Sequence, residues 1–129
     1  MAMGRGKCMK VLFIAFLVIG LSSYIHALKT HIVGDSQGWG FSVSYSDWAD
    51  ESYFDEHSFL AVFNYPAGAH NVVPVDVAGY RSCKARATQV QKEASTGNDK
   101  FTLKKGANYF VCSFPGHCSA GMKIQANAN

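Results

Sequence analysis

The sequence lacks an apolar run long enough to cross a membrane. Its longest run, residues 11–21, is about half of the roughly 20 residues that a spanning helix needs. Three cations and no acid occupy the ten residues before it. A basic start followed by a short apolar run is typical of a secretory signal peptide. We therefore predict a leader over residues 1–27, removed by cleavage after Ala27, and one secreted domain over residues 28–129.

The sequence also lacks the signal for attachment to a membrane through a lipid anchor. After Met122 only K-I-Q-A-N-A-N remains, without the Pro/Ser-rich stalk or the hydrophobic tail of a lipid-anchored protein. No N-x-S/T sequon is present, so we do not expect N-glycosylation. These features predict a freely secreted, monomeric protein with no membrane anchor.

A net charge is missing from the mature chain. The whole sequence has 12 Lys and Arg against 9 Asp and Glu, but three of the cations belong to the leader. The remaining charges balance, so the chain has no excess of basic residues. Nucleic acid and acidic lipid both require a basic patch, and neither is expected as a partner.

Cysteine and methionine are scarce once the leader is removed. Three cysteines remain, Cys83, Cys112 and Cys118, and Met122 is the only methionine. An odd number of cysteines in an oxidising compartment indicates one disulfide and one thiol with another use.

Short apolar and β-branched runs alternate with turn residues along the mature chain. Seven or eight such runs indicate an all-β, antiparallel sandwich or barrel. We expect a loop or short helix over the acidic residues 46–57, best explained as solvated surface, and a helical turn over residues 79–84. The predicted strands are residues 31–33, 41–45, 59–65, 70–75, 101–103, 109–112 and 122–126.

The segment C-S-F-P-G-H-C-S-A-G-M places Cys112, His117 and Met122 at even spacing between two predicted strands. Taken singly, these residues would be a buried thiol, a surface histidine and a core methionine. Together on one loop they form a metal-binding pattern, which His70 in Y-P-A-G-A-H-N-V-V can complete. Two imidazoles, one thiolate and a weak axial thioether suit copper in electron transfer.

These motifs resemble the phytocyanins, the plant branch of the blue copper cupredoxins. The similarity rests on N-Y-F-V-C-S-F-P-G-H-C-S-A-G-M-K-I and F-N-Y-P-A-G-A-H-N-V-V, and it is greatest to the plantacyanin, or basic blue, branch. It implies a cupredoxin-like Greek-key β-sandwich with short helical turns. It also implies one type 1 copper ion on His70, Cys112, His117 and Met122, in a protein of the plant apoplast or cell wall.

The same resemblance implies a disulfide between Cys83 and Cys118. If His117 faces the metal, the adjacent Cys118 can face away from it, and Cys112 then remains a thiolate. The pairing of Cys83 with Cys112 stays open as an alternative, and it would remove the copper ligand.

A site of this kind carries single electrons rather than catalysing a reaction. We expect the electron to leave through the edge of His117, with Phe114, Pro115 and Gly116 as a small apolar docking surface for a transient protein or small-molecule partner. Asn71 is expected to tie the first histidine segment to the backbone near the cysteine.

Three other classes of function compete with electron transfer. A cysteine hydrolase would use Cys112, His117 and Asn71, but nothing marks Cys112 as the start of a helix, where such nucleophiles are often activated. A structural zinc site normally has paired C-x2-4-C spacing, which the chain lacks. An extracellular matrix or signalling protein, in which copper redox is incidental, would keep the same fold and ligands.

Overall fold

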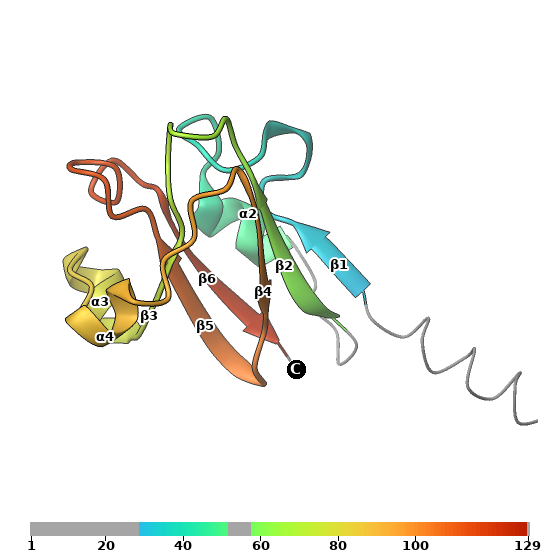
Figure 1. Cartoon of the computed structure of the whole chain (residues 1–129). Coiled ribbons are helices and arrows are strands. Elements are labelled where there is room, and N and C mark those ends of the chain that lie inside the picture. The colour runs from blue at the N-terminus through green and yellow to red at the C-terminus, as the bar shows by residue number, and fades with distance from the viewer. Residues whose placement is uncertain (1–28, 52–57, 129) are drawn as a thin grey trace, which may run out of the picture.

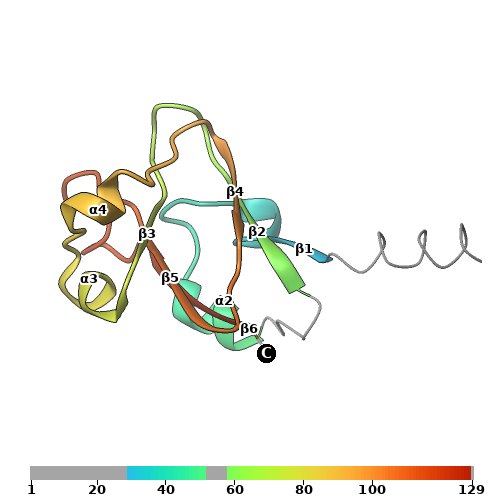
Figure 2. The ribbon, with the colours of Figure 1, turned by 60° about the horizontal axis from the view of Figure 1, so that its bottom comes forward.

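The computed structural model describes residues 29–51 and 58–128, and the predicted leader with its cleavage after Ala27 lies outside them. Six strands form two three-stranded sheets (Figures 1 and 2). One sheet has the order β1 (Lys29–Ile32), β2 (Ser58–Asn64), β4 (Asn98–Thr102), and the other β3 (Val73–Val75), β5 (Gly106–Val111), β6 (Lys123–Ala128). A 3-10 helix, η1 (Asp35–Gln37), and three helices, α2 (Tyr45–Glu51), α3 (Val77–Ser82) and α4 (Ala87–Val90), connect them.

Pairing within the sheets is mostly antiparallel, with one exception. β2 pairs with β4, and β5 pairs with both β3 and β6, in antiparallel register. β1 runs parallel to β2, which departs from the antiparallel sandwich that we expected. A parallel pair needs a long crossover connection, and the segment between these two strands contains η1 and α2.

The interior of the sandwich follows the two-residue period of the strands. In β5, Phe110 belongs to the main core, whereas the next residue, Val111, packs on the other face of the sheet in a smaller cluster. Cys112 returns to the main core. Successive side chains of a strand point to opposite faces, so this alternation places the thiol inside the sandwich.

The predicted strand at residues 41–45 is wrong. These residues form bends and extended chain, and Tyr45 is the first residue of α2. Phe41 is exposed and Val43 is partly buried, whereas Tyr45 is buried. The Tyr45 hydroxyl donates to Gly38 O at 2.9 Å and accepts from Gly40 N at 2.7 Å. A buried tyrosine therefore ties this segment to the preceding turn, and the described residues contain six strands rather than seven or eight.

The helices pack at the two edge strands of the second sheet, β3 and β6. α3 packs against β3 and β5, and α4 against β3, so both helices lie near β3 (Figure 1). α2 packs against β6. Helix α3 corresponds to the helical turn predicted over residues 79–84, and α2 to the short helix predicted in the acidic segment. No helix within the described ranges is long and apolar enough to span a membrane.

Candidate metal centre

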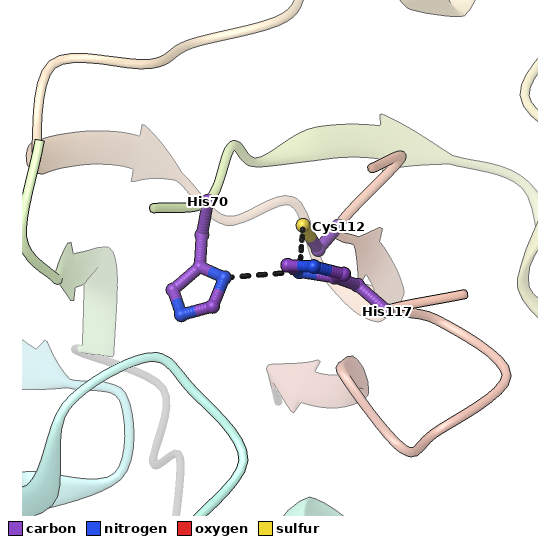
Figure 3. Close-up of side chains that lie close together, drawn as sticks. All are labelled: His70, Cys112 and His117. Atoms are coloured by element: carbon purple, nitrogen blue, oxygen red, sulfur yellow. Dashed lines mark hydrogen bonds between the residues drawn. The ribbon is translucent and has the colours of Figure 1, made fainter. Parts of the chain in front are cut away.

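Three donor side chains from separate segments meet at one point (Figure 3). His70 precedes β3, Cys112 follows β5, and His117 lies in the loop between β5 and β6. The two Nδ1 atoms of the histidines are 3.0 Å apart, and Cys112 Sγ lies 3.4 Å from His117 Nδ1. All three donor atoms lie within 4.8 Å of one another.

The loop between β5 and β6 is closed by its own backbone. His117 N donates to Phe114 O at 3.0 Å, and Met122 N donates to His117 O at 3.1 Å. Cys112 N in turn donates to Met122 O at 3.0 Å. Met122 is fully buried and shares the main core cluster with Cys112. The spacing C-x4-H-x4-M therefore places Cys112 and Met122 at the two ends of one loop, where their backbones are joined by a hydrogen bond.

The spacing of the donor atoms fits a single first-row metal ion. Such ions lie about 2.0–2.3 Å from imidazole nitrogen and thiolate sulfur, which separates two donors by about 3.3–3.8 Å at tetrahedral or trigonal angles. The distances of 3.0 and 3.4 Å are close to this range. Two nitrogens, one thiol sulfur and a nearby thioether are soft and borderline donors, which favour copper over the oxygen-binding ions.

The burial of His70 lowers its pKa and thereby favours metal binding. His70 is only 9% exposed. Desolvation lowers the pKa of His70, and the adjacent His117 lowers it further, because a second positive charge there would be repelled. The imidazole of His70 is therefore neutral at physiological pH, which is the form that binds a metal.

The cysteine pairing is resolved in favour of Cys83 with Cys118, whose Cα atoms are 5.7 Å apart. Cys112 is the free cysteine of the described chain, and it is completely buried. Cys118 and Cys83 belong to the smaller cluster on the outer face of the second sheet, together with Val111. The alternative disulfide from Cys83 to Cys112 is excluded because the two thiols lie on opposite faces of that sheet.

Asn71 lies between the two ligand-bearing segments. Its Oδ1 accepts from Ser113 N at 2.8 Å, and its Nδ2 donates to Ser113 Oγ at 2.7 Å. The backbone carbonyl of Asn71 accepts from Trp39 Nε1 at 3.0 Å. Since Ser113 follows Cys112 directly, this amide joins the His70 segment to the Cys112 segment.

Phe41 is a site residue that the sequence did not reveal. Its ring centroid lies 5.5 Å from that of His70 and 4.8 Å from that of His117, although the side chain is 57% exposed. Phe114 lies against His117 at 5.5 Å, and Pro115 and Gly116 are exposed beside it. The sequence predicts a strand at Phe41, and no spacing or motif links this residue to the histidines.

A glycine brings Phe41 to this position. Gly38 has a φ of 69°, and a Cβ there would lie 2.5 Å from Asn64 O. Only glycine allows this close approach without strain. The turn is fixed to β2 because Trp39 N donates to Asn64 O at 2.8 Å, and Phe41 follows two residues later.

Comparisons with known proteins agree with this arrangement. The family model described as "Plastocyanin-like domain" matches residues 39–122. The chain belongs to this family, the phytocyanins. This phytocyanin is 36% identical to the chemocyanin of Lilium longiflorum over 130 residues and 37% identical to a basic blue protein of Arabidopsis thaliana over 134 residues, each covering 99% of both chains.

A solved structure extends the comparison to the fold. Cucumber basic protein, described as a blue copper protein, is 38% identical and superposes with a TM-score of 0.69 over 78% of this chain and all of its own. The predicted cupredoxin-like fold is confirmed by this likeness. His70, Cys112 and His117, with Met122, fit one type 1 copper ion, as the donor chemistry requires. Membership of the family supports a copper-binding electron carrier.

Proposed function

We propose that this phytocyanin is a secreted type 1 copper protein that carries single electrons, with His70, Cys112, His117 and Met122 as the metal ligands. The proposal rests chiefly on one observation. The free cysteine and the two histidines place their donor atoms within 4.8 Å of one another, although they come from three segments of the chain.

The protein's contribution is a rigid set of donors. Bound copper supplies a one-electron couple between Cu(II) and Cu(I), and the two states favour different geometries. Cys112 is buried at the end of β5, and the loop that carries His117 and Met122 is closed by backbone hydrogen bonds. Donors held in this way move little when the charge of the site changes, which keeps the reorganisation small.

Electron exit runs through the edge of His117, which is partly exposed while His70 and Cys112 are buried. Phe114, Pro115 and Gly116 form the apolar docking surface beside it, and exposed Phe41, whose ring also contacts His117, adds to this surface. An apolar patch of this size suits a small, transient encounter with a redox partner. Secretion of a monomer into the apoplast, after removal of residues 1–27, is part of the same proposal.

The visible spectrum tests the copper site. Protein folded from Leu28 onward and loaded with Cu(II) is compared with a Cys112→Ser variant. We expect an intense blue thiolate-to-copper band in the wild type and its loss in the variant, because serine offers no thiolate. A colourless wild type with intact β structure would contradict the proposed function.

Electron exchange separates the proposal from its main alternative. A blue protein that is reduced and reoxidised rapidly by small one-electron reagents supports an electron carrier. A blue protein that exchanges electrons with none of them would favour a matrix or signalling role in which copper redox is incidental.

A further inference from the structure

Glu93 lies outside both ligand motifs, yet its side chain contacts the support of the metal centre. Its Oε1 accepts from Asn71 Nδ2 at 2.9 Å. We propose that Glu93 is a positioning residue for the copper centre: it fixes the Asn71 amide and thereby holds the His70 and Cys112 segments in one arrangement. The copper part of this inference rests on the proposed function.

The Asn71 amide is buried and fully occupied. Asn71 is 1% exposed, and its side chain has two N–H donors and one carbonyl acceptor. The side-chain Oδ1 accepts from Ser113 N, one Nδ2–H is donated to Ser113 Oγ, and the other to Glu93 Oε1. Without Glu93, one N–H of a buried amide loses its partner, which is costly in a protein interior.

The contacts also determine which way the amide faces. A carboxylate can only accept and a backbone N–H can only donate, whereas a serine hydroxyl can do either. Glu93 therefore attracts the amide nitrogen, while Ser113 N attracts the amide oxygen. These two contacts allow a single orientation of Asn71, and this orientation ties the residue after His70 to the residue after Cys112.

Backbone hydrogen bonds of Glu93 and Ala94 place Glu93 beside Asn71. Glu93 N donates to Val90 O at 3.0 Å, which anchors the residue to the end of α4. The next residue, Ala94, exchanges two backbone hydrogen bonds with Val72, at 2.9 and 3.0 Å. Because the chain is held on both sides of Glu93, its backbone is already ordered, and only side-chain rotamer freedom is lost in placing the carboxylate.

The negative charge of Glu93 has a second effect. Glu93 is exposed, but its carboxylate hydrogen-bonds directly to Asn71, the residue after His70. Its charge, reduced by solvent screening, stabilises the more positive Cu(II) state relative to Cu(I). Loss of the charge is therefore expected to raise the reduction potential, whereas loss of the hydrogen bond loosens Asn71. The two effects are separable by substitution.

Three variants of the full mature chain test the proposal. Glu93→Ala removes both charge and acceptor, Glu93→Gln keeps an acceptor oxygen, and Asp47→Asn removes one charge from an exposed residue of α2 as a matched control. Hydrogen exchange of the Ser113 amide is followed by NMR in metal-free protein. The reduction potential is then measured in copper-loaded protein.

We expect Glu93→Ala to speed hydrogen exchange of the Ser113 amide by about tenfold, because one charge-assisted hydrogen bond that holds Asn71 is lost. In Glu93→Gln, which keeps an acceptor, we expect the exchange rate to stay within about twofold of the wild type. Both substitutions raise the potential, Ala more than Gln, and Asp47→Asn changes it less than either. Ala and Gln variants that coincide in both measurements, or a Glu93→Ala protein with wild-type exchange, would overturn the inference. Since the exchange is measured without metal, failure of the copper function appears separately as a missing blue band in the wild type.

Discussion

Met122 is the proposed axial donor of the site and is as fully buried as Cys112, so its chemistry can be changed without altering the surface. A thioether sulfur favours Cu(I), whereas an amide oxygen is a harder donor that favours Cu(II). We expect Met122→Gln to lower the reduction potential by at least about 59 mV, which is tenfold in the equilibrium constant of a one-electron couple. Voltammetry of the copper-loaded variant measures the shift.

Met122→Leu is the matched control for this prediction. Leucine keeps the apolar volume in the fully buried position but offers no donor atom, so the potential is expected to rise. Glutamine should also lower the free energy of unfolding by roughly 1–3 kcal/mol, because its amide is buried in the core. A shift of the potential in the same direction in both variants would show that Met122 is not a metal ligand.

At the scale of a single element, helix α3 brings Cys83 to its disulfide partner. Asp76 caps the helix by accepting from Gly79 N at 2.8 Å, and its carboxylate also pairs with Arg86 at 2.5 Å. Cys83 ends the helix in the left-handed conformation, with a φ of 56°. The cap and this turn together direct the cysteine towards Cys118.

The cap predicts an acid-sensitive stability. The hydrogen bond from Gly79 N lowers the pKa of Asp76 below its ordinary 3.8, and Gln89 and Arg86 act in the same direction. A carboxylate with a lowered pKa stabilises the folded state above its ordinary pKa, and this stabilisation is lost as the pH falls through the lowered value. We therefore expect the urea concentration at the midpoint of unfolding to decrease as the pH is lowered through this range.

Asp76→Asn separates the cap from other acid effects. Asparagine is also a good N-cap but does not titrate, so the variant should lose less stability between pH 4 and pH 2 than the wild type does. Urea unfolding at several pH values, followed by circular dichroism, makes the comparison. Identical acid dependence in the two proteins would assign the effect to other carboxyl groups.

At the scale of the whole molecule, the disulfide joins α3 to the ligand loop. Cys83 and Cys118 are 35 residues apart, and a closed loop of this length stabilises a fold by roughly 4 kcal/mol on the chain-entropy model. We expect the double variant Cys83→Ala/Cys118→Ala to lose about this much free energy of unfolding in metal-free protein, as measured by denaturant titration. Replacing both residues prevents a new pairing with Cys112.

The copper site should survive this change where the chain still folds. Cys118 packs in the outer cluster and supplies no donor, so the blue band of the folded double variant is expected to remain. Loss of the band at a denaturant concentration where the fold persists would show that the disulfide also sets the position of His117.

Most strands could be predicted because their signals are local. The apolar runs at residues 59–65, 109–112 and 122–126 correspond to β2, β5 and β6 within a few residues. The run at 41–45 failed because its apolar residues have separate roles: Phe41 lies exposed against the histidines, Val43 packs partly on the core, and Tyr45 is buried and bonded to a turn. Alternation of apolar and polar residues therefore does not by itself establish a half-buried strand.

The sequence by itself predicted the proposed donor set and the fold class of this phytocyanin. Cys112, His117 and Met122 share one short loop, so their spacing alone brings them together, and the odd cysteine count left one thiol for a metal. The tertiary structure decided what depends on contacts between distant segments. It placed Phe41 against both histidines and Glu93 against Asn71, and it separated Cys118 from Cys112 by the two faces of one sheet. Such contacts carry no local sequence signal, because each partner alone is an ordinary surface or core residue.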